Sequence, residues 1–275
     1  LIGLTLVGFG TSAPELVTSI QAARAGSPGI AVGNVVGSNI ANILLILGAS
    51  ALITPIAVGS KALARDGLVM LAVSVAFTAV GYLYQLDRIV GALFIAVLAV
   101  YLVFVYRQER TAPAGEHGAA YDKAVAYEET HDGPIGHPKH VKAWAERLGT
   151  VMSLGMALAG LVVVVLGGDL LVQGATALAR NYGVSETVIG LTIVAIGTSM
   201  PEFVTSVLAA IRKHSDVALG NIMGSNIYNI LGIAGCTGLV SPTPIPAEIV
   251  RYDNLVMLGA TVAMVTMART GYRLS

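Results

Sequence analysis

The chain has 275 residues, of which 55% are hydrophobic and only 12% are charged, and its formal net charge is zero. Soluble domains carry about twice this share of charge, and the composition excludes a disordered chain, a disulfide scaffold and a nucleic-acid binder with a basic face. The mean hydropathy of +0.77 and the 32 glycines predict a polytopic membrane protein instead.

Apolar segments long enough to cross a bilayer recur along the whole chain. A spanning helix needs about 20 mostly apolar residues. By this criterion eight spans are expected, near residues 2–23, 30–53, 66–84, 89–106, 151–173, 186–210, 217–240 and 253–269. The sequence starts at Leu1, inside the first span, without a signal-peptide pattern. We therefore expect residue 1 to be a fragment boundary.

A hydrophilic stretch at residues 107–148 separates the two apolar halves. It holds 13 of the 32 charged residues and four of the five histidines. We expect a solvated loop there, between a first unit at 1–106 and a second at 149–275; the irregular spacing of the histidines does not favour a metal site. If this loop is cytoplasmic, twelve of the sixteen Lys and Arg residues lie on that side, in agreement with the positive-inside rule. Trp144 is expected at the membrane interface.

The two halves are related by an internal repeat. Residues 3–48 align without a gap with residues 190–235, at an offset of 187, and 26 of the 46 aligned residues are identical. The same offset places the partners of the 151–173 and 89–106 spans outside the sequence, so we expect a parent protein with ten spans, five in each repeat. Five is odd, so the repeats insert with opposite orientation, as in known transporters. The predicted fold is an all-α polytopic membrane protein with two inverted-topology repeats.

Glu15 and Glu202, which are equivalent in the two repeats, stand near the middle of apolar segments. An ionisable group at membrane depth is costly and marks an ion or proton path, and no Lys or Arg lies at comparable depth to make it a structural pair. Pro14 and Pro201 each remove a backbone hydrogen bond and so free carbonyl oxygens nearby. Hydroxyls three and four residues before each glutamate share its helix face; they belong to Thr11, Ser12, Thr198 and Ser199.

A second polar group follows in the next span of each repeat. Its members with a spacing of four residues are Ser38, Asn42, Ser225 and Asn229. Asn34 and Asn221 are interpreted as interhelical hydrogen-bonding or capping residues, whereas Asn39 and Asn226 are equally compatible with that structural role and with a role in the cation site. Oxygen ligands without Cys or His favour Ca²⁺ and Na⁺ over zinc or copper, and two carboxylates are neutralised by one Ca²⁺ or two Na⁺.

The motif Gly-Thr-Ser-x-Pro-Glu followed by Gly-Asn-x-x-Gly-Ser-Asn-Ile-x-Asn, present twice, resembles the two alpha-repeats of the sodium/calcium exchanger family, in the cation/calcium antiporter superfamily; the prokaryotic calcium/sodium antiporters are most similar. The resemblance implies alternating access, Ca²⁺ exchanged for several Na⁺ without a cofactor, and a pair of sliding spans. It implies a cation site of Glu15, Glu202, Thr11, Thr198, Ser12, Ser199, Ser38, Ser225, Asn42 and Asn229, with backbone carbonyls near Gly8 and Ala195. Some members carry Asp where this chain has Asn42 or Asn229, so the stoichiometry and any K⁺ or H⁺ involvement stay open.

We also expect a monomer in the lipid bilayer of a prokaryotic cell membrane, with Ca²⁺ and Na⁺ as substrates and no nucleic-acid partner. A Ca²⁺/H⁺ or K⁺-dependent exchanger is the first alternative, and a passive cation channel is a more distant one. The sequence contains no nucleophile–base pair or phosphate loop, which argues against an enzyme. Asp169 fits either an ion entrance or an interfacial carboxylate.

Overall fold

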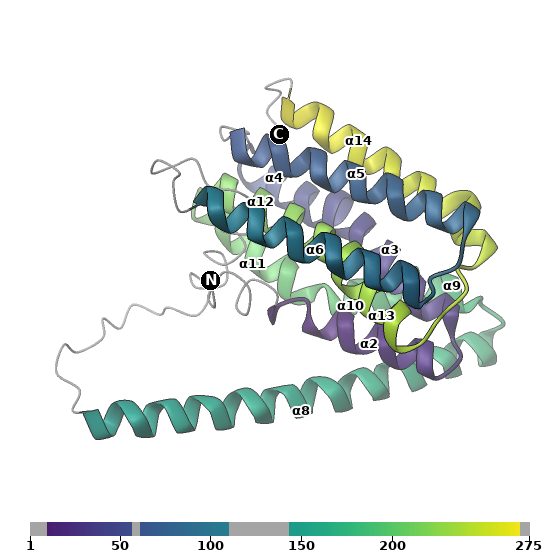
Figure 1. Cartoon of the computed structure of the whole chain (residues 1–275), viewed down its shortest axis with the longest axis horizontal. Coiled ribbons are helices and arrows are strands. Elements are labelled where there is room, and N and C mark those ends of the chain that lie inside the picture. The colour runs from purple at the N-terminus through teal and green to yellow at the C-terminus, as the bar shows by residue number, and fades with distance from the viewer. Residues whose placement is uncertain (1–9, 57–60, 110–142, 270–275) are drawn as a thin grey trace.

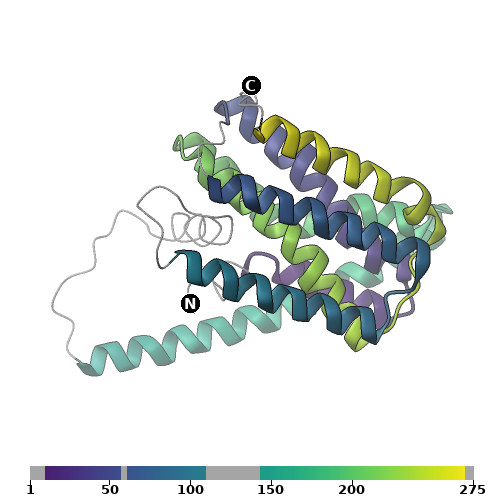
Figure 2. The ribbon, with the colours of Figure 1, turned by 45° about the horizontal axis from the view of Figure 1, so that its top comes forward.

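The computed structural model describes residues 10–56, 61–109 and 143–269. These residues form a bundle of helices, and the only β pairing among them is a single bridge between Leu86 and Thr243. Figures 1 and 2 show long helices running side by side, with α8 along one outer edge. The predicted all-α architecture is therefore confirmed.

The first repeat consists of one short helix and three long helical segments. Their bounds are α2 (Ala13–Arg24), α3 (Pro28–Ala41) continued by the π-helix η2 (Asn42–Leu47) and α4 (Gly48–Ile53), α5 (Lys61–Leu83) and α6 (Arg88–Glu109). The span predicted at 30–53 is thus one continuous rod that contains a π-helical turn. The beginning of the span predicted at 2–23 lies outside the described residues.

The second repeat starts with α8 (Ala143–Tyr182), which has 40 residues. A helix of that length is about 60 Å long, roughly twice the hydrocarbon thickness of a bilayer. It is longer at both ends than the span predicted at 151–173, because no proline interrupts it. The remaining elements are α9 (Glu186–Ile189), η3 (Gly190–Val194), α10 (Ala195–Thr198), α11 (Met200–Ile211), α12 (Ser215–Tyr228), η4 (Asn229–Ala234), α13 (Gly235–Val240), η5 (Ile249–Asp253) and α14 (Asn254–Arg269).

Five helical segments among the described residues are long and apolar enough to cross a membrane, and a sixth is formed by the α9–α10 and α11 pair, which is bent by 51°. The other two predicted spans correspond to α2, whose preceding residues are not described, and to the continuous segment Ser215–Val240.

Burial separates a central rod from peripheral helices. In an apolar 18-residue stretch of Pro28–Ile53, 83% is buried inside the protein, whereas the corresponding stretches of Arg88–Gln108 in α6 and Val162–Tyr182 in α8 are buried to 28% and 22%. Exposed apolar side chains such as Leu93 and Val100 therefore cover the outside of α6. An apolar exterior around a polar interior is what a bilayer environment favours, because only the interior must satisfy polar groups.

Close helix approach positions the central rod. An added Cβ on Gly37 would lie 2.5 Å from the carbonyl oxygen of Leu191 and 2.8 Å from Cβ of Ala195, and Gly33 faces the backbone of Gly190 in the same way. Small residues let membrane helices come this close. As a result α3, from the first repeat, lies directly against η3 and α10, from the second.

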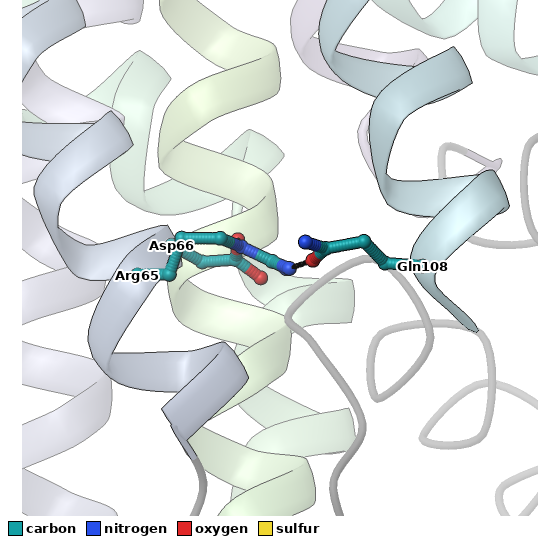
Figure 3. A network of polar contacts seen from close by, with 3 residues as sticks. All are labelled: Arg65, Asp66 and Gln108. Carbon is teal, nitrogen blue, oxygen red and sulfur yellow. Dashed lines mark hydrogen bonds and ion pairs between the residues drawn. The ribbon is translucent and has the colours of Figure 1, made fainter. Parts of the chain in front are cut away.

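Asp66 is a fully buried carboxylate outside the repeated motifs. Arg65, beside it at the start of α5, pairs with it over 2.7 Å between Nη2 and Oδ1. Figure 3 shows that the same guanidinium also donates to Gln108 on α6, and it lies 5.5 Å from the centre of the Phe104 ring. This network neutralises Asp66 and connects the end of α6 to the start of α5.

Candidate cation site

Both repeated glutamates occupy the first turn of a helix that begins next to a proline. Ser12 and Ser199 are the N-cap residues of α2 and α11, and Pro14 and Pro201 stand in the first turn of each helix. Because proline has no N–H, the preceding helix cannot continue through it unbroken. The positive end of each new helix dipole stabilises a carboxylate at this position. Glu15 is 1% exposed and Glu202 is fully buried.

Two crossed hydrogen bonds bring the glutamates together. The Ser12 hydroxyl donates to Oε1 of Glu202 over 2.6 Å, and the Ser199 hydroxyl donates to Oε1 of Glu15 over 2.9 Å. Neither serine caps its own helix with its side chain, so each repeat's serine serves the other repeat's glutamate. The carboxylates thus face one shared interior region. Ser225 also lies near Glu202, with 3.5 Å between its hydroxyl and Oε1.

The next helices add amide and hydroxyl oxygens. Asn42 and Asn229 are the first residues of the π-helices η2 and η4, and π-helical turns often occur at functional sites. Among the candidate ligands, four have a buried oxygen without any hydrogen-bond partner in the described part of the chain: Oγ1 of Thr11, Oγ of Ser38, Oδ1 of Asn42 and Oδ1 of Asn229. Such groups are rare in native proteins, and an absent ion or water is one explanation. This donor set fits a hard cation such as Ca²⁺ or Na⁺.

Asn34 and Asn221 make the interhelical hydrogen bonds that the sequence suggested. The amide of Asn34 donates to the Glu15 carbonyl over 3.2 Å and to the Ser19 hydroxyl over 2.9 Å. The amide of Asn221 donates to the Ser206 hydroxyl over 2.8 Å and lies 3.5 Å from the Glu202 carbonyl. Ser19 and Ser206 were missed as supporting residues, although the repeat alignment pairs them.

Three other predicted positions differ in their placement. Gly8 lies outside the described residues. Ala195 is buried, and its carbonyl accepts hydrogen bonds from the Thr198 hydroxyl over 3.3 Å and from the Ser199 N–H over 3.1 Å. Asp169 is exposed on α8, where it accepts a hydrogen bond from Gln173 over 2.7 Å. It is not brought to the glutamates.

No group of three or more His, Cys, Asp or Glu side chains that could hold a metal ion occurs in the ranges that the structure describes. The acidic character of the site therefore comes from two carboxylates, and its other oxygens are neutral.

Comparison with known proteins supports this interpretation. The family model described as "Sodium/calcium exchanger protein" matches residues 1–107 and 152–274. CaxA of Alkalimonas amylolytica, named as an antiporter, is 39% identical over 272 residues, which are 98% of this chain and 78% of that protein. The sodium/calcium exchanger MaX1 of Methanosarcina acetivorans is 31% identical, over 100% of this chain and 83% of its own length.

A solved structure of the sodium-calcium exchanger NCX_Mj, soaked with Na⁺, is also similar. It is 29% identical in sequence and superimposes with a TM-score of 0.62, over 100% of this chain and 80% of that one. Together with the inverted repeat and the helical architecture, these matches show that this chain belongs to the sodium/calcium exchanger family of membrane-embedded secondary transporters and is not an enzyme.

Proposed function

We propose that the protein exchanges Ca²⁺ for Na⁺ at one site between Glu15 and Glu202, reached alternately from the two sides of the membrane. The observation that carries this proposal is the pair of crossed serine–glutamate hydrogen bonds, Ser12 to Glu202 and Ser199 to Glu15. A site made equally from two inverted repeats can open to either side when the repeats exchange conformations.

The charge of the site explains how two different ions can compete for it. One Ca²⁺ or two Na⁺ balances the two carboxylates, and an empty site leaves two buried charges in a medium where each costs several kcal/mol. Reorientation is therefore favoured when either ion occupies the site and disfavoured when none does. The proposed ligands are Glu15, Glu202, Thr11, Thr198, Ser12, Ser199, Ser38, Ser225, Asn42 and Asn229, with backbone carbonyls near Gly8 and Ala195.

The hydroxyl-rich surroundings favour Na⁺ over H⁺ as the coupling ion. A proton needs only the carboxylates, whereas Na⁺ needs several neutral oxygens, and the site offers Thr11 and Ser38 hydroxyls with no hydrogen-bond partner in the described chain. A passive channel would not need two inverted repeats with equivalent carboxylates.

The proposal includes a topology. Placing the 107–148 loop in the cytoplasm puts twelve of the sixteen basic residues inside. Figure 1 shows that the start of α5, the start of α8 and the ends of α6 and α14 lie at the same end of the bundle. The units 1–106 and 149–275 would then be the two inverted repeats, in the cell membrane of a prokaryote.

Radioactive Ca²⁺ uptake tests the function. Proteoliposomes that contain the full-length protein are loaded with Na⁺ and diluted into Na⁺-free buffer. We expect uptake that requires the Na⁺ gradient and is abolished in Glu15→Gln and in Glu202→Gln. Glu248→Gln is the matched control, since Glu248 is exposed and lies outside both copies of the motif.

Two outcomes would contradict the proposal. Near-normal flux in either site variant would remove that glutamate from the site. Uptake driven equally well by a pH gradient without Na⁺ would assign the glutamates to proton exchange.

A further inference from the structure

Four buried asparagines near the site are not among its proposed ligands: Asn34, Asn39, Asn221 and Asn226. The repeat offset of 187 residues makes Asn34 equivalent to Asn221 and Asn39 equivalent to Asn226. Each equivalent pair would have the same hydrogen bonds if the two repeats had the same conformation. Their side-chain oxygens instead differ.

The first difference concerns the threonine ligands. The Thr198 hydroxyl donates to Oδ1 of Asn34 over 2.9 Å, a shorter distance than the 3.3 Å to its other acceptor, the Ala195 carbonyl oxygen. The equivalent bond would join Thr11 to Asn221, but neither Oγ1 of Thr11 nor Oδ1 of Asn221 has a hydrogen-bond partner in the chain as far as it is described.

The second difference concerns the asparagine ligands. The amide of Asn42 donates to Oδ1 of Asn226 over 2.8 Å. The equivalent bond would join Asn229 to Asn39, yet Oδ1 of Asn39 and Oδ1 of Asn229 are both without a partner among the described residues. Two bonds that cross between the repeats are therefore made, and both of their equivalents are broken.

Other contacts near the site are made in both repeats, although Ser225 reaches Glu202 over 3.5 Å while Oγ of the equivalent Ser38 has no partner among the described residues. The crossed serine–glutamate bonds exist in both directions. The amides of Asn34 and Asn221 both reach the serine of their own repeat, over 2.9 Å and 2.8 Å. The contacts that hold each glutamate's helix in place are thus made in both repeats. The asparagine contacts to Thr198 and Asn42 are made, but the equivalent contacts to Thr11 and Asn229 are not.

These contacts determine whether a ligand oxygen is ready for a cation. A hydroxyl has one proton and two lone pairs, and a proton directed at Asn34 leaves the lone pairs of Thr198 available on the other side. Likewise, the amide of Asn42 is anchored by Asn226, so its Oδ1 is left for an ion. Thr198 and Asn42 are therefore held in one orientation by a hydrogen bond, whereas Thr11 and Asn229, which are also proposed ligands, lack the equivalent bond.

We infer that the four asparagines are positioning residues of a reciprocal switch, an inference that rests on the proposed exchange function. In the conformation described here, Asn34 and Asn226 orient Thr198 and Asn42. When the site faces the other side, Asn221 and Asn39 accept hydrogen bonds from Thr11 and Asn229, and the bonds to Asn34 and Asn226 open. Each access state thus has its own oriented threonine and asparagine.

The switch predicts that replacing equivalent asparagines has opposite effects on the two access states. Removing Asn34 or Asn226 destabilises the state described here, and removing Asn221 or Asn39 destabilises the opposite state. A ligand's apparent affinity falls with the population of the state that binds it. Variants of equivalent residues should therefore change the affinities on the two membrane faces in opposite directions.

The experiment compares Asn34→Ala with Asn221→Ala, and Asn226→Ala with Asn39→Ala. For each variant in the full-length protein, the half-saturating Ca²⁺ concentration is measured in right-side-out and in inverted membrane vesicles. The ratio of these two concentrations is then compared with the ratio for the unmutated protein. The net value of one hydrogen bond corresponds to a shift of about two- to tenfold in the ratio. Asn34→Ala and Asn226→Ala should shift it one way, and Asn221→Ala and Asn39→Ala the other.

Equal shifts, or none, in both members of a pair would overturn the switch, because a purely structural role affects both faces alike. If the Asn34 and Asn221 variants cannot be isolated, the Asn39 and Asn226 pair decides the question by itself, since no hydrogen bond joins these two side chains to the helices of the glutamates. The exchange function is tested separately. If the unmutated protein shows Na⁺-driven Ca²⁺ uptake and Glu202→Gln abolishes it, the proposed function stands whatever happens to the ratio of the two half-saturating concentrations.

Discussion

At the scale of single residues, the proposed cation site has a low charge for its number of oxygens. Glu15 and Glu202 are its acids, and Asn42 and Asn229 supply neutral oxygens at the starts of η2 and η4. Since the protein offers two negative charges, a change of one charge at Asn229 should alter the ion coupling rather than only the affinity.

Asn229→Asp should make Ca²⁺ binding depend on pH. Three close carboxylates repel one another, so one of them keeps a proton at neutral pH and releases it when Ca²⁺ binds. The half-saturating Ca²⁺ concentration of the variant should then fall about tenfold for each unit by which the pH is raised, over the range where one proton is released per bound Ca²⁺. The measurement is Ca²⁺ uptake at a series of pH values.

Asn181→Asp is the control, because it adds the same charge at an exposed position on α8. A variant at Asn229 whose pH profile matches that of the control would show that residue 229 does not face the bound ion.

At the scale of helices, the central position of α3 depends on glycines that face a backbone. Gly37 contacts η3 and α10, the segment that leads to Thr198 and Ser199. The site geometry therefore depends on a helix contact as well as on the ligands themselves.

Gly37→Ala should destabilise the protein by about 1–3 kcal/mol, the usual cost of overpacking, because the new Cβ would lie 2.5 Å from the Leu191 carbonyl oxygen. The thermal unfolding midpoint in detergent measures this effect. Gly48→Ala in α4 has no atom within 4 Å of its new Cβ and should leave the midpoint unchanged or raise it, since alanine is favoured in a helix. Equal midpoints for the two variants would contradict the close contact.

Helix positions were predictable from the sequence, but helix interruptions were not. Hydropathy located the rod at 30–53 and the long α6, because burial in lipid needs a continuous apolar run. Only the prolines at 14 and 201 indicated a break. The π-helical turns at Asn42 and Asn229 and the 51° bend before Met200 depend on packing between repeats, which no local pattern contains.

At the scale of the whole molecule, the basic residues predict which face is cytoplasmic. A cysteine at Thr130, in the 107–148 loop, should react with a membrane-impermeant maleimide in inverted vesicles and not in intact cells. The native Cys236 is first replaced by Ser. A cysteine at Tyr84, which is 67% exposed between α5 and α6, should show the opposite pattern. Labelling of both positions from the same side would reject the topology.

The internal repeat paired each candidate ligand with its equivalent in the other half, because both carry the same motifs. It did not predict that Ser12 would bind Glu202 rather than Glu15, since crossing between repeats depends on how the halves dock. It also could not predict that Oδ1 of Asn34 accepts a hydrogen bond whereas Oδ1 of Asn221 does not. Equivalent sequences in one chain can adopt two conformations.

The crossed serine–glutamate bonds have a consequence for how such a protein can arise and be assembled. Each glutamate accepts a hydrogen bond from the N-cap serine of the other repeat, so a single repeat contains only half of the proposed site. Two copies of one repeat, inserted in opposite directions, would make the same contacts between separate chains. The covalent link through the loop therefore supplies proximity and a fixed ratio of the halves, while the ability to hold an ion belongs to the antiparallel pairing itself.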